Sequence, residues 1–230
     1  EHTVALCLAL NRHLKMTLKQ LEIHNFSLSN AILGTNLNEK TVGILGTGNI
    51  GRITAKIFLG FGCKILCYDA IEDAEFAQTH NVTYCSLDEV LSKSDVLSLH
   101  LPLLPATKHI INHNSVAKMK EGAIIVNTSR GGLIHTEALL AGIKSGKILG
   151  AALDVYEKEG KYFFEDCHEI QLDDEILKEL LEHPNVLLTP HQAFFTKEAL
   201  RQIAKVTFEN VKEFMQDGKK LLQMTNTCLK

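Results

Sequence analysis

The 230-residue chain lacks several patterns that would assign it to common classes of protein. Its apolar run near the amino end, residues 4–10, is far shorter than the roughly 20 residues that a helix needs to cross a bilayer. The start also lacks the basic flank and cleavage site of a signal peptide. The net charge is -3 and no basic stripe is present. We therefore expect neither a membrane nor nucleic acid as a partner.

The cysteines lack the C-x-x-C spacing that would support a zinc or thioredoxin-like site. Several lie in apolar, strand-like runs, which favours reduced thiols in a cytoplasmic protein. Three histidines also lack the carboxylate or cysteine spacing of a metal site, so we expect no bound metal. Of these, His100 should follow a strand, and His109 and His113 should lie on a surface helix. The cysteines are Cys7, Cys63, Cys67, Cys85, Cys167 and Cys228.

Hydrophobic residues make up 45% of the chain, enough to bury a substantial core. Short apolar runs alternate with stretches of helical periodicity, which predicts an α/β fold with a doubly wound, mostly parallel sheet. The expected strands are residues 41–45, 64–68, 82–84, 96–99, 124–127, 148–153 and 186–188. The expected helices are residues 3–18, 49–61, 72–78, 87–93, 115–119, 136–145, 175–181 and 196–214, with another helical segment near Lys108.

A glycine-rich turn, G-T-G-N-I-G at residues 46–51, joins the first strand to the next helix. Gly46 permits a tight turn, Gly48 lets the backbone approach a pyrophosphate, and Gly51 lets the helix pack closely on the strand. Asp69 follows the second strand, where a carboxylate would bind ribose hydroxyls and repel a 2′-phosphate. A turn that merely links strand to helix would leave Asp69 an ordinary surface residue. The coincidence of strand, glycines and acid favours an NAD site.

Later strands are also followed by residues that could do chemistry, at the edge where open parallel sheets bind ligands. Arg130 could clamp a substrate carboxylate or form a structural ion pair. Asp154 and Glu159 follow another strand. They could face the ligand cleft or simply belong to a solvated acidic loop. His191 follows the last strand, and a carboxylate such as Glu159 would orient its ring and favour its protonated form. With a hydride donor, Arg130, Glu159 and His191 could together reduce a ketone.

These motifs resemble the D-2-hydroxyacid dehydrogenase family, most closely its bacterial-type D-lactate branch. The resemblance covers nearly the whole chain, and residues 162–166 and 191–196 favour that branch. It implies that Arg130, Glu159 and His191 are the catalytic trio and that Phe194 lines the substrate pocket with Arg130 and His191. The implied cofactor contacts are Gly46, Gly48, Asn49, Ile50, Gly51, Asp69, Leu101, Pro102, Thr107, Thr128, Ser129 and Asp154.

The resemblance also implies how the chain is organised. Residues 1–194 would form the NAD-binding domain, including an amino-terminal hinge and dimer helix. Residues 195–230 would return to a second, substrate domain of which this chain holds a remnant. Family members carry a substrate-domain segment ahead of the point where this sequence starts, so we expect sequence upstream.

The implied protein is a cytoplasmic homodimer that reduces pyruvate, or a close 2-oxo acid, to the D-2-hydroxy acid with NADH. Two alternatives stay open at this point. One is a non-catalytic, NAD-sensing protein of the corepressor type, which could carry the same trio. The other is a dehydrogenase for a 2-hydroxy acid with a larger side chain.

Overall fold

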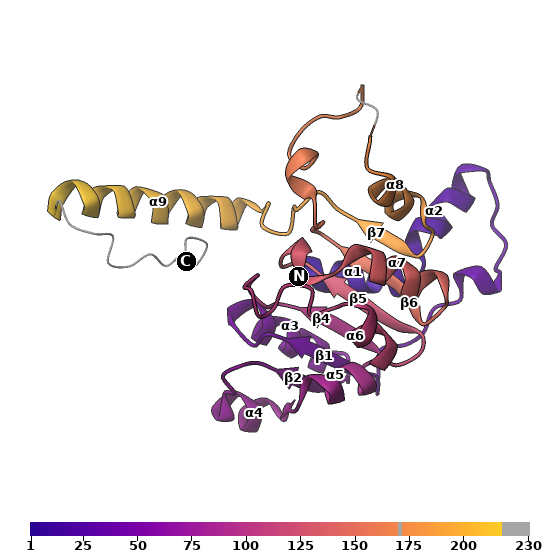
Figure 1. The fold of residues 1–230 in the computed structure, drawn as a ribbon, viewed down its shortest axis with the longest axis horizontal. Helices are drawn as coiled ribbons and strands as arrows, with labels where there is room; N and C mark the ends of the chain where they lie inside the picture. Colours follow the sequence, from indigo (N-terminus) through magenta and orange to yellow (C-terminus); the bar gives the residue numbers. More distant parts are fainter. Residues whose placement is uncertain (170–171, 218–230) are drawn as a thin grey trace. The chain divides into compact units, whose positions relative to one another are not determined.

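The computed structural model describes residues 1–169 and 172–217 and divides the chain into two compact units, Glu1–His191 and Gln192–Lys230. The first unit is built on a seven-stranded sheet of order β3-β2-β1-β4-β5-β6-β7, in which every neighbouring pair is parallel (Figure 1). The predicted fold is confirmed, with every strand within one residue of its expected bounds. The strands are β1 Thr41–Leu45, β2 Lys64–Tyr68, β3 Thr83–Tyr84, β4 Val96–Leu99, β5 Ala123–Asn127, β6 Ile148–Leu153 and β7 Val186–Leu188.

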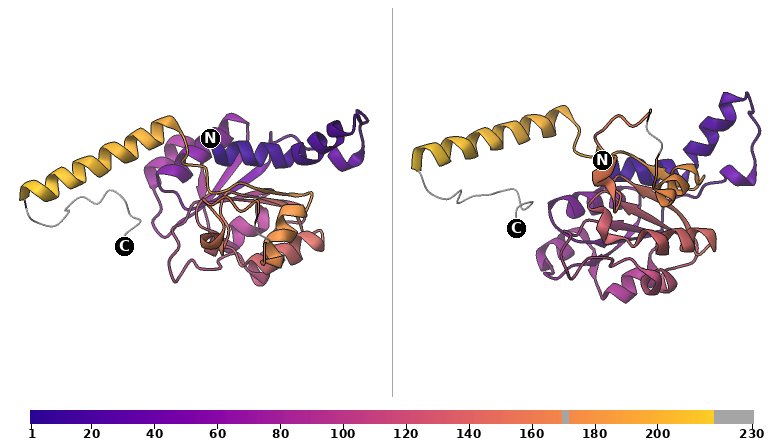
Figure 2. Two further views of the ribbon diagram at one scale, coloured as in Figure 1. Left: turned by 90° about the horizontal axis from the view of Figure 1, so that it is seen from above. Right: turned by 45° about the horizontal axis from the view of Figure 1, so that its top comes forward.

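Helices cover both faces of this sheet (Figures 1 and 2). On one face, α1, α3 and α4 contribute to one apolar cluster, for example through Cys7 and Phe58. On the other face, α5 to α8 contribute to a second cluster, for example through Leu91 and Leu139. The described helices are α1 His2–Asn11, α2 Leu14–Glu22, α3 Asn49–Gly60, α4 Ala74–His80, α5 Leu87–Lys93, α6 His113–Lys118, α7 Thr136–Lys144, α8 Glu175–Glu182 and α9 Lys197–Asp217.

The strands read as continuous apolar runs because both faces of the sheet are covered. In β5 every residue is buried; Ile124 and Val126 join the cluster under α1 and α3, whereas Ile125 joins the cluster under α5 to α8. This alternation is the two-residue period of a strand. The core therefore lies on the two sides of the central strands, and the polar side chains collect where the strands end.

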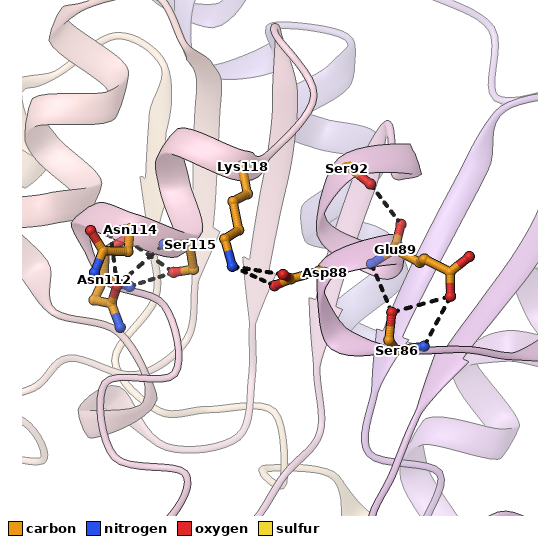
Figure 3. A network of polar contacts seen from close by, with 8 residues as sticks. All are labelled: Ser86, Asp88, Glu89, Ser92, Asn112, Asn114, Ser115 and Lys118. Atoms are coloured by element: carbon orange, nitrogen blue, oxygen red, sulfur yellow. Dashed lines mark hydrogen bonds and ion pairs between the residues drawn. The ribbon is translucent and has the colours of Figure 1, made fainter.

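Side-chain caps define where two of the covering helices begin (Figure 3). Ser86 and Glu89 form a reciprocal capping box at the start of α5, and Asn112 and Ser115 form a second one at the start of α6. Each box satisfies backbone N–H groups that a helix start leaves unpaired. Lys118 of α6 then reaches Asp88 of α5 at 2.7 Å, so the two helices that flank β4 in sequence are joined.

Two helical predictions are wrong. Residues 3–18 do not form one helix, because α1 ends at Asn11 and His13 adopts a left-handed conformation, with φ of 50°, before α2 begins. The apolar periodicity continues across this break and conceals it. The segment near Lys108 is a turn, and His109 lies there with φ of 52°, half-buried rather than on a surface helix. His113 is the first residue of α6.

Residues 14–33 form an arm that extends from the body of the first unit, with α2 at its base (Figures 1 and 2). Lys15 fixes the base by donating hydrogen bonds to the carbonyl oxygens of Leu181, His183 and Val186, at 2.8, 2.9 and 2.9 Å. Leu18 and Phe26 of the arm are 60% and 78% exposed. Across residues 1–169 and 172–217, no helix is both long and apolar enough to traverse a bilayer.

Candidate active site

The predicted site residues that belong to the first unit gather at one edge of the sheet, because all seven strands are parallel and their carboxyl ends meet there. The glycine turn follows β1, Asp69 follows β2, and Leu101 lies just beyond β4. Thr128 follows β5 directly, and Asp154 follows β6 directly. The topology therefore assembles, from segments far apart in sequence, the edge that the motifs predicted.

The glycine turn fits a dinucleotide pyrophosphate. Gly46 has φ of 97°, and a Cβ on Gly51 would lie 1.9 Å from the carbonyl oxygen of Gly46, so neither position accepts a side chain without strain. A Cβ on Gly48 would meet nothing within 4 Å, which leaves open space above the turn. Helix α3 begins at Asn49 without a side-chain cap, so its first N–H groups are available to phosphate oxygens.

Asp69 is held beside this turn, half-buried at the end of β2. Its Oδ2 accepts a hydrogen bond of 2.6 Å from the backbone N–H of Thr47, the residue between the first two glycines. The carboxylate is therefore positioned by the same turn that fits the pyrophosphate. This placement suits a group that binds the adenosine ribose next to the phosphates.

His100, which follows β4, closes over the glycine turn. A Cβ on Gly46 would lie 2.7 Å from the carbonyl group of His100, so the two backbones are in close contact. The imidazole Nε2 lies 2.8 Å from the hydroxyl of Ser98. Burial lowers the pKa of His100 to about 4, so its ring is neutral near neutral pH. We therefore assign His100 no proton-transfer role.

Side-chain hydrogen bonds from two predicted cofactor residues, Ser129 and Thr107, order the loops after β4 and β5. The Ser129 hydroxyl donates to the carbonyl oxygen of Leu101 at 2.7 Å. The Thr107 hydroxyl donates to the carbonyl oxygen of Pro102 at 2.6 Å and so closes the loop after β4 on itself. Leu101, Pro102 and Thr107 thus lie on one loop, which Ser129 joins to the next loop at the site edge.

The start of α1 also reaches this edge, which the motifs did not reveal. The hydroxyls of Thr3 and Thr128 lie 2.7 Å apart. Asp154 is fully buried and accepts a hydrogen bond from Thr189, while His2 Nε2 lies 3.3 Å from its Oδ1 and 3.1 Å from the Thr189 hydroxyl. His2 and Thr189 therefore surround the carboxylate that the family resemblance places next to the nicotinamide amide.

Glu159 and His191 meet, as the motifs predicted they could. Glu159 Oε1 lies 3.0 Å from His191 Nδ1, and Glu159 Oε2 accepts a 3.0 Å hydrogen bond from the backbone N–H of Tyr156. The carboxylate is thus oriented by backbone and in turn orients the imidazole. His191 has φ of 55°, an uncommon conformation for a residue with a side chain, which turns the chain sharply after β7.

Arg130 lies at the start of the short 3-10 helix Gly131–Leu133, with its side chain exposed. The Asn127 amide donates to the carbonyl oxygen of Arg130 at 2.9 Å, and Asn127 Oδ1 accepts from the backbone N–H of Ser129 at 3.0 Å. Buried Asn127 therefore fixes the backbone from which Arg130 extends. The guanidinium donates to the Ser129 carbonyl oxygen at 2.7 Å.

Phe164 is a neighbour of the histidine that no motif identified. Its ring centroid lies 5.7 Å from that of His191, and its side chain is 69% exposed. The run of aromatic residues at 162–164 was the available signal, but the sequence could not show that the chain turns back to His191. Predicted Phe194 lies in the second unit, where its ring packs edge-to-face on Phe195 with centroids 6.2 Å apart.

A second carboxylate–histidine pair braces the loops around the site. Glu157 Oε1 lies 2.5 Å from His109 Nε2, and Glu157 Oε2 accepts 3.1 Å and 3.3 Å hydrogen bonds from the hydroxyl and N–H of Thr136. Burial by itself would raise the pKa of Glu157, but these hydrogen bonds outweigh it and lower the pKa below its ordinary value. The pair links the loop after β4 to the loop that carries Glu159.

This arrangement defines a class: a dinucleotide-binding α/β domain with an oriented histidine at its ligand edge, as in nicotinamide-dependent oxidoreductases. The family follows from comparison with known proteins. The model of the "D-isomer specific 2-hydroxyacid dehydrogenase, NAD binding domain" matches residues 4–193. The chain belongs to this family, which confirms the resemblance and NAD as the family's cofactor.

Individual relatives agree with this assignment. The chain is 45% identical to "2-hydroxyacid dehydrogenase A" of Aspergillus oryzae over 94% of this chain and 61% of that protein. It is 42% identical to an "aromatic 2-oxoacid reductase" of Clostridium sporogenes over 95% of this chain and 65% of that protein. A D-lactate dehydrogenase of Aquifex aeolicus, solved with NAD and lactic acid, superposes with a TM-score of 0.87 at 38% identity, over 94% and 65% of the two chains. The chain thus spans less than two thirds of the length of these curated relatives.

Proposed function

We propose that this chain is the coenzyme-binding part of an NAD-dependent D-2-hydroxyacid dehydrogenase that interconverts pyruvate and D-lactate. The observation that carries the proposal is the 3.0 Å contact between Glu159 and His191, at the same sheet edge as the glycine turn. A binding domain needs the turn, but an oriented histidine is what proton transfer to a carbonyl requires. The likeness to the D-lactate dehydrogenase of Aquifex aeolicus supports lactate as the product.

The cofactor would lie along the strand ends. The N–H groups at the start of α3 would hold the pyrophosphate, Asp69 the adenosine ribose, and buried Asp154 the nicotinamide carboxamide. When bound, NADH supplies a hydride to the carbonyl carbon of the substrate. Asp154 would fix which face of the nicotinamide meets the substrate, because Thr189 and His2 hold its carboxylate in place.

His191 and Arg130 would supply the rest of the chemistry. Because Nδ1 of His191 faces Glu159, Nε2 is the nitrogen that would donate a proton to the carbonyl oxygen. Glu159 keeps the ring oriented. The planar guanidinium of Arg130 would bind the substrate carboxylate through two parallel hydrogen bonds and polarise the adjacent carbonyl.

A larger, aromatic 2-oxo acid is the second candidate substrate. Phe164 lies against the His191 ring with its side chain exposed, so it could contact an aromatic substituent. The Clostridium sporogenes relative, an aromatic 2-oxoacid reductase, supports this possibility. The two candidates differ in the size of the side chain and not in the roles of Arg130, Glu159 and His191.

An NADH-oxidation assay over a panel of 2-oxo acids tests the proposal, run on residues 1–230 and on the longest form of the protein that the cell makes. We expect pyruvate to be reduced, to the D enantiomer, faster than phenylpyruvate or 4-methyl-2-oxopentanoate. A preference for phenylpyruvate would favour the second candidate. Tight NADH binding without reduction of any 2-oxo acid by either form would contradict both and favour a non-catalytic NAD sensor.

We also propose that the protein forms a homodimer through the arm of residues 14–33. The arm exposes large apolar side chains, among them Leu18, Phe26 and Leu28, and Lys15 anchors it to the body. Light scattering after size-exclusion chromatography should give a dimer mass for the parent and a monomer mass for a Leu18→Glu, Phe26→Glu variant. Phe61→Asp, at an exposed apolar position outside the arm, should remain dimeric.

A cytoplasmic location is a further proposal, supported by the thiols. The five cysteines in the described part of the chain are unpaired, and Cys228 lies outside it. Burial raises the pKa of Cys7 and of Cys67 to about 12. Such buried, protonated thiols suit a reducing compartment. Fractionation of cells should recover the protein, with all six thiols titratable after denaturation, in the cytoplasmic fraction; recovery of a disulfide-bonded form elsewhere would refute this location.

A further inference from the structure

Three side chains meet where the neighbouring strands β3, β2 and β1 end. In the parallel register, Leu45 of β1 lies beside Tyr68 of β2, and Cys67 of β2 lies beside Tyr84 of β3. Thr47 after β1, Asp69 after β2 and Tyr84 at the end of β3 are thereby brought together, although Thr47 and Tyr84 are 37 positions apart in the sequence.

The hydrogen bonds among these three side chains run in one direction. Tyr84 Oη lies 2.8 Å from Thr47 Oγ1, which lies 3.1 Å from Asp69 Oδ2. An ionised carboxylate can accept but not donate, so the threonine proton points to Asp69. The threonine oxygen must then accept the proton of Tyr84. We call Tyr84, Thr47 and Asp69 the hydroxyl relay.

The relay fixes one carboxylate oxygen of Asp69, and the other is held less tightly. Oδ2 accepts from both the N–H and the hydroxyl of Thr47, which is itself 2% exposed and so has little freedom to move. Oδ1 accepts a longer, 3.3 Å hydrogen bond from the N–H of Ile71. A carboxylate oxygen has two lone pairs, so Oδ1 retains capacity for a ribose hydroxyl.

The positive charge of nearby Arg52 is not available to a 2′-phosphate, so it does not favour NADP. An arginine close to the ribose is what accommodates the 2′-phosphate of NADP in related folds. Here Arg52 Nε donates to the Thr47 carbonyl oxygen at 2.6 Å, and its Nη1 pairs with Asp73 Oδ2 at 2.5 Å. Its guanidinium also lies over the ring of Phe76. Arg52 therefore stabilises the turn, and its charge is already balanced by Asp73.

We propose that Thr47 and Tyr84 are positioning residues that set the preference for NAD over NADP, because they hold the Asp69 carboxylate against the 2′ position of the ribose. Without the relay, the carboxylate keeps its hydrogen bond from the Thr47 N–H but loses the one from the hydroxyl, so it is held less firmly against the nucleotide. The contact with the ribose hydroxyls weakens, and repulsion of a 2′-phosphate weakens with it. The inference rests on nucleotide binding at the glycine turn and does not require turnover.

Equilibrium titrations of the intact chain with NADH and with NADPH test the proposal. Nucleotide fluorescence is the signal, and the two affinities are the result. We expect Thr47→Val to reduce the ratio of the two affinities about 10-fold and Tyr84→Phe about 3-fold, the usual range for losing one hydrogen bond. Thr47→Ser keeps the hydroxyl and should restore most of the ratio. ADP-ribose, which lacks the nicotinamide, should lose affinity in each variant to the same extent as NADH, because the relay acts at the adenosine end.

Tyr156→Phe is the matched control, because it also removes a tyrosine hydroxyl hydrogen bond, here to Asp174. It should leave the NADH-to-NADPH ratio unchanged. An unchanged ratio in well-folded Tyr84→Phe and Thr47→Val would overturn the relay, and Tyr84→Phe alone decides if Thr47→Val unfolds. NADH binding with the expected ratios, but no reduction of any 2-oxo acid by either form of the protein, would support the relay and contradict the proposed function. A parent chain that binds neither nucleotide would overturn both.

Discussion

The two ends of the site edge are built differently. The nucleotide end comprises the glycine turn of residues 46–51 and Asp69. These residues directly follow β1 and β2 and are held by short hydrogen bonds. At the catalytic end, comprising Arg130, Glu159 and His191, Arg130 is exposed and the other two side chains are about a quarter exposed. The proposed nucleotide site is therefore built into the sheet, whereas the proposed catalytic groups lie on loops beyond it. The two should be separable by mutation.

The largest expected effect is on catalysis alone. Arg130→Lys should lower kcat/KM for the 2-oxo acid about 10³-fold, because an ammonium cannot replace a planar fork that binds and polarises the substrate. NADH affinity should change less than about twofold. Steady-state kinetics and fluorescence titration measure the two quantities, and Arg12→Lys, at an exposed arginine distant in sequence from the site motifs, serves as the control. A near-normal rate in Arg130→Lys would remove Arg130 from the mechanism.

A smaller effect is expected when the nucleotide end is disturbed. Gly51→Ala places a Cβ 1.9 Å from the Gly46 carbonyl oxygen, so the turn must shift. We expect a loss of about 3 kcal/mol in unfolding free energy and weaker NADH binding. Gly60→Ala, on the same helix α3 and with open space around its Cβ, should stay within about 0.5 kcal/mol of the parent. Equal losses in the two variants, measured by urea denaturation, would contradict the packing role of Gly51.

The smallest expected effect is a pH dependence at the nucleotide end. The pKa of His100 is about 4 in the folded chain, against about 6.5 when unfolded. As the pH falls from about 6.5 to 4, the unfolded chain takes up a proton that the folded chain does not, so stability is lost. His100→Gln cannot titrate and should lose about 1–2 kcal/mol less than the parent over this window. Urea denaturation at several pH values measures the difference, and parallel curves for parent and variant would contradict it.

The sequence predicted most of the fold because apolar runs and glycines are local signals. The strand bounds, the glycine turn and the helices that follow it needed no knowledge of distant residues. The pairing of Glu159 with His191 was also foreseeable, since both follow strands of the same parallel sheet. The break at His13 was not, because the apolar spacing of residues 3–18 fits one continuous helix although the backbone turns left-handed.

What the sequence could not predict depends on strand register. Tyr84 contacts Thr47 because β3 and β1 flank β2 in a particular alignment. In the same way, His2 reaches Asp154 across 152 positions because α1 packs against β5 and β6. No spacing rule within one segment encodes such contacts. They appear when the strand order and the covering helices are known.

The two edges of the sheet have a consequence for the chain at high concentration. β3 contains two residues and β7 contains three, whereas the inner strands of the sheet contain four to six. An edge strand presents unpaired N–H and C=O groups that can recruit a strand of another molecule, and short edges offer few of them. The two edges of this all-parallel sheet therefore offer few backbone groups to an incoming strand.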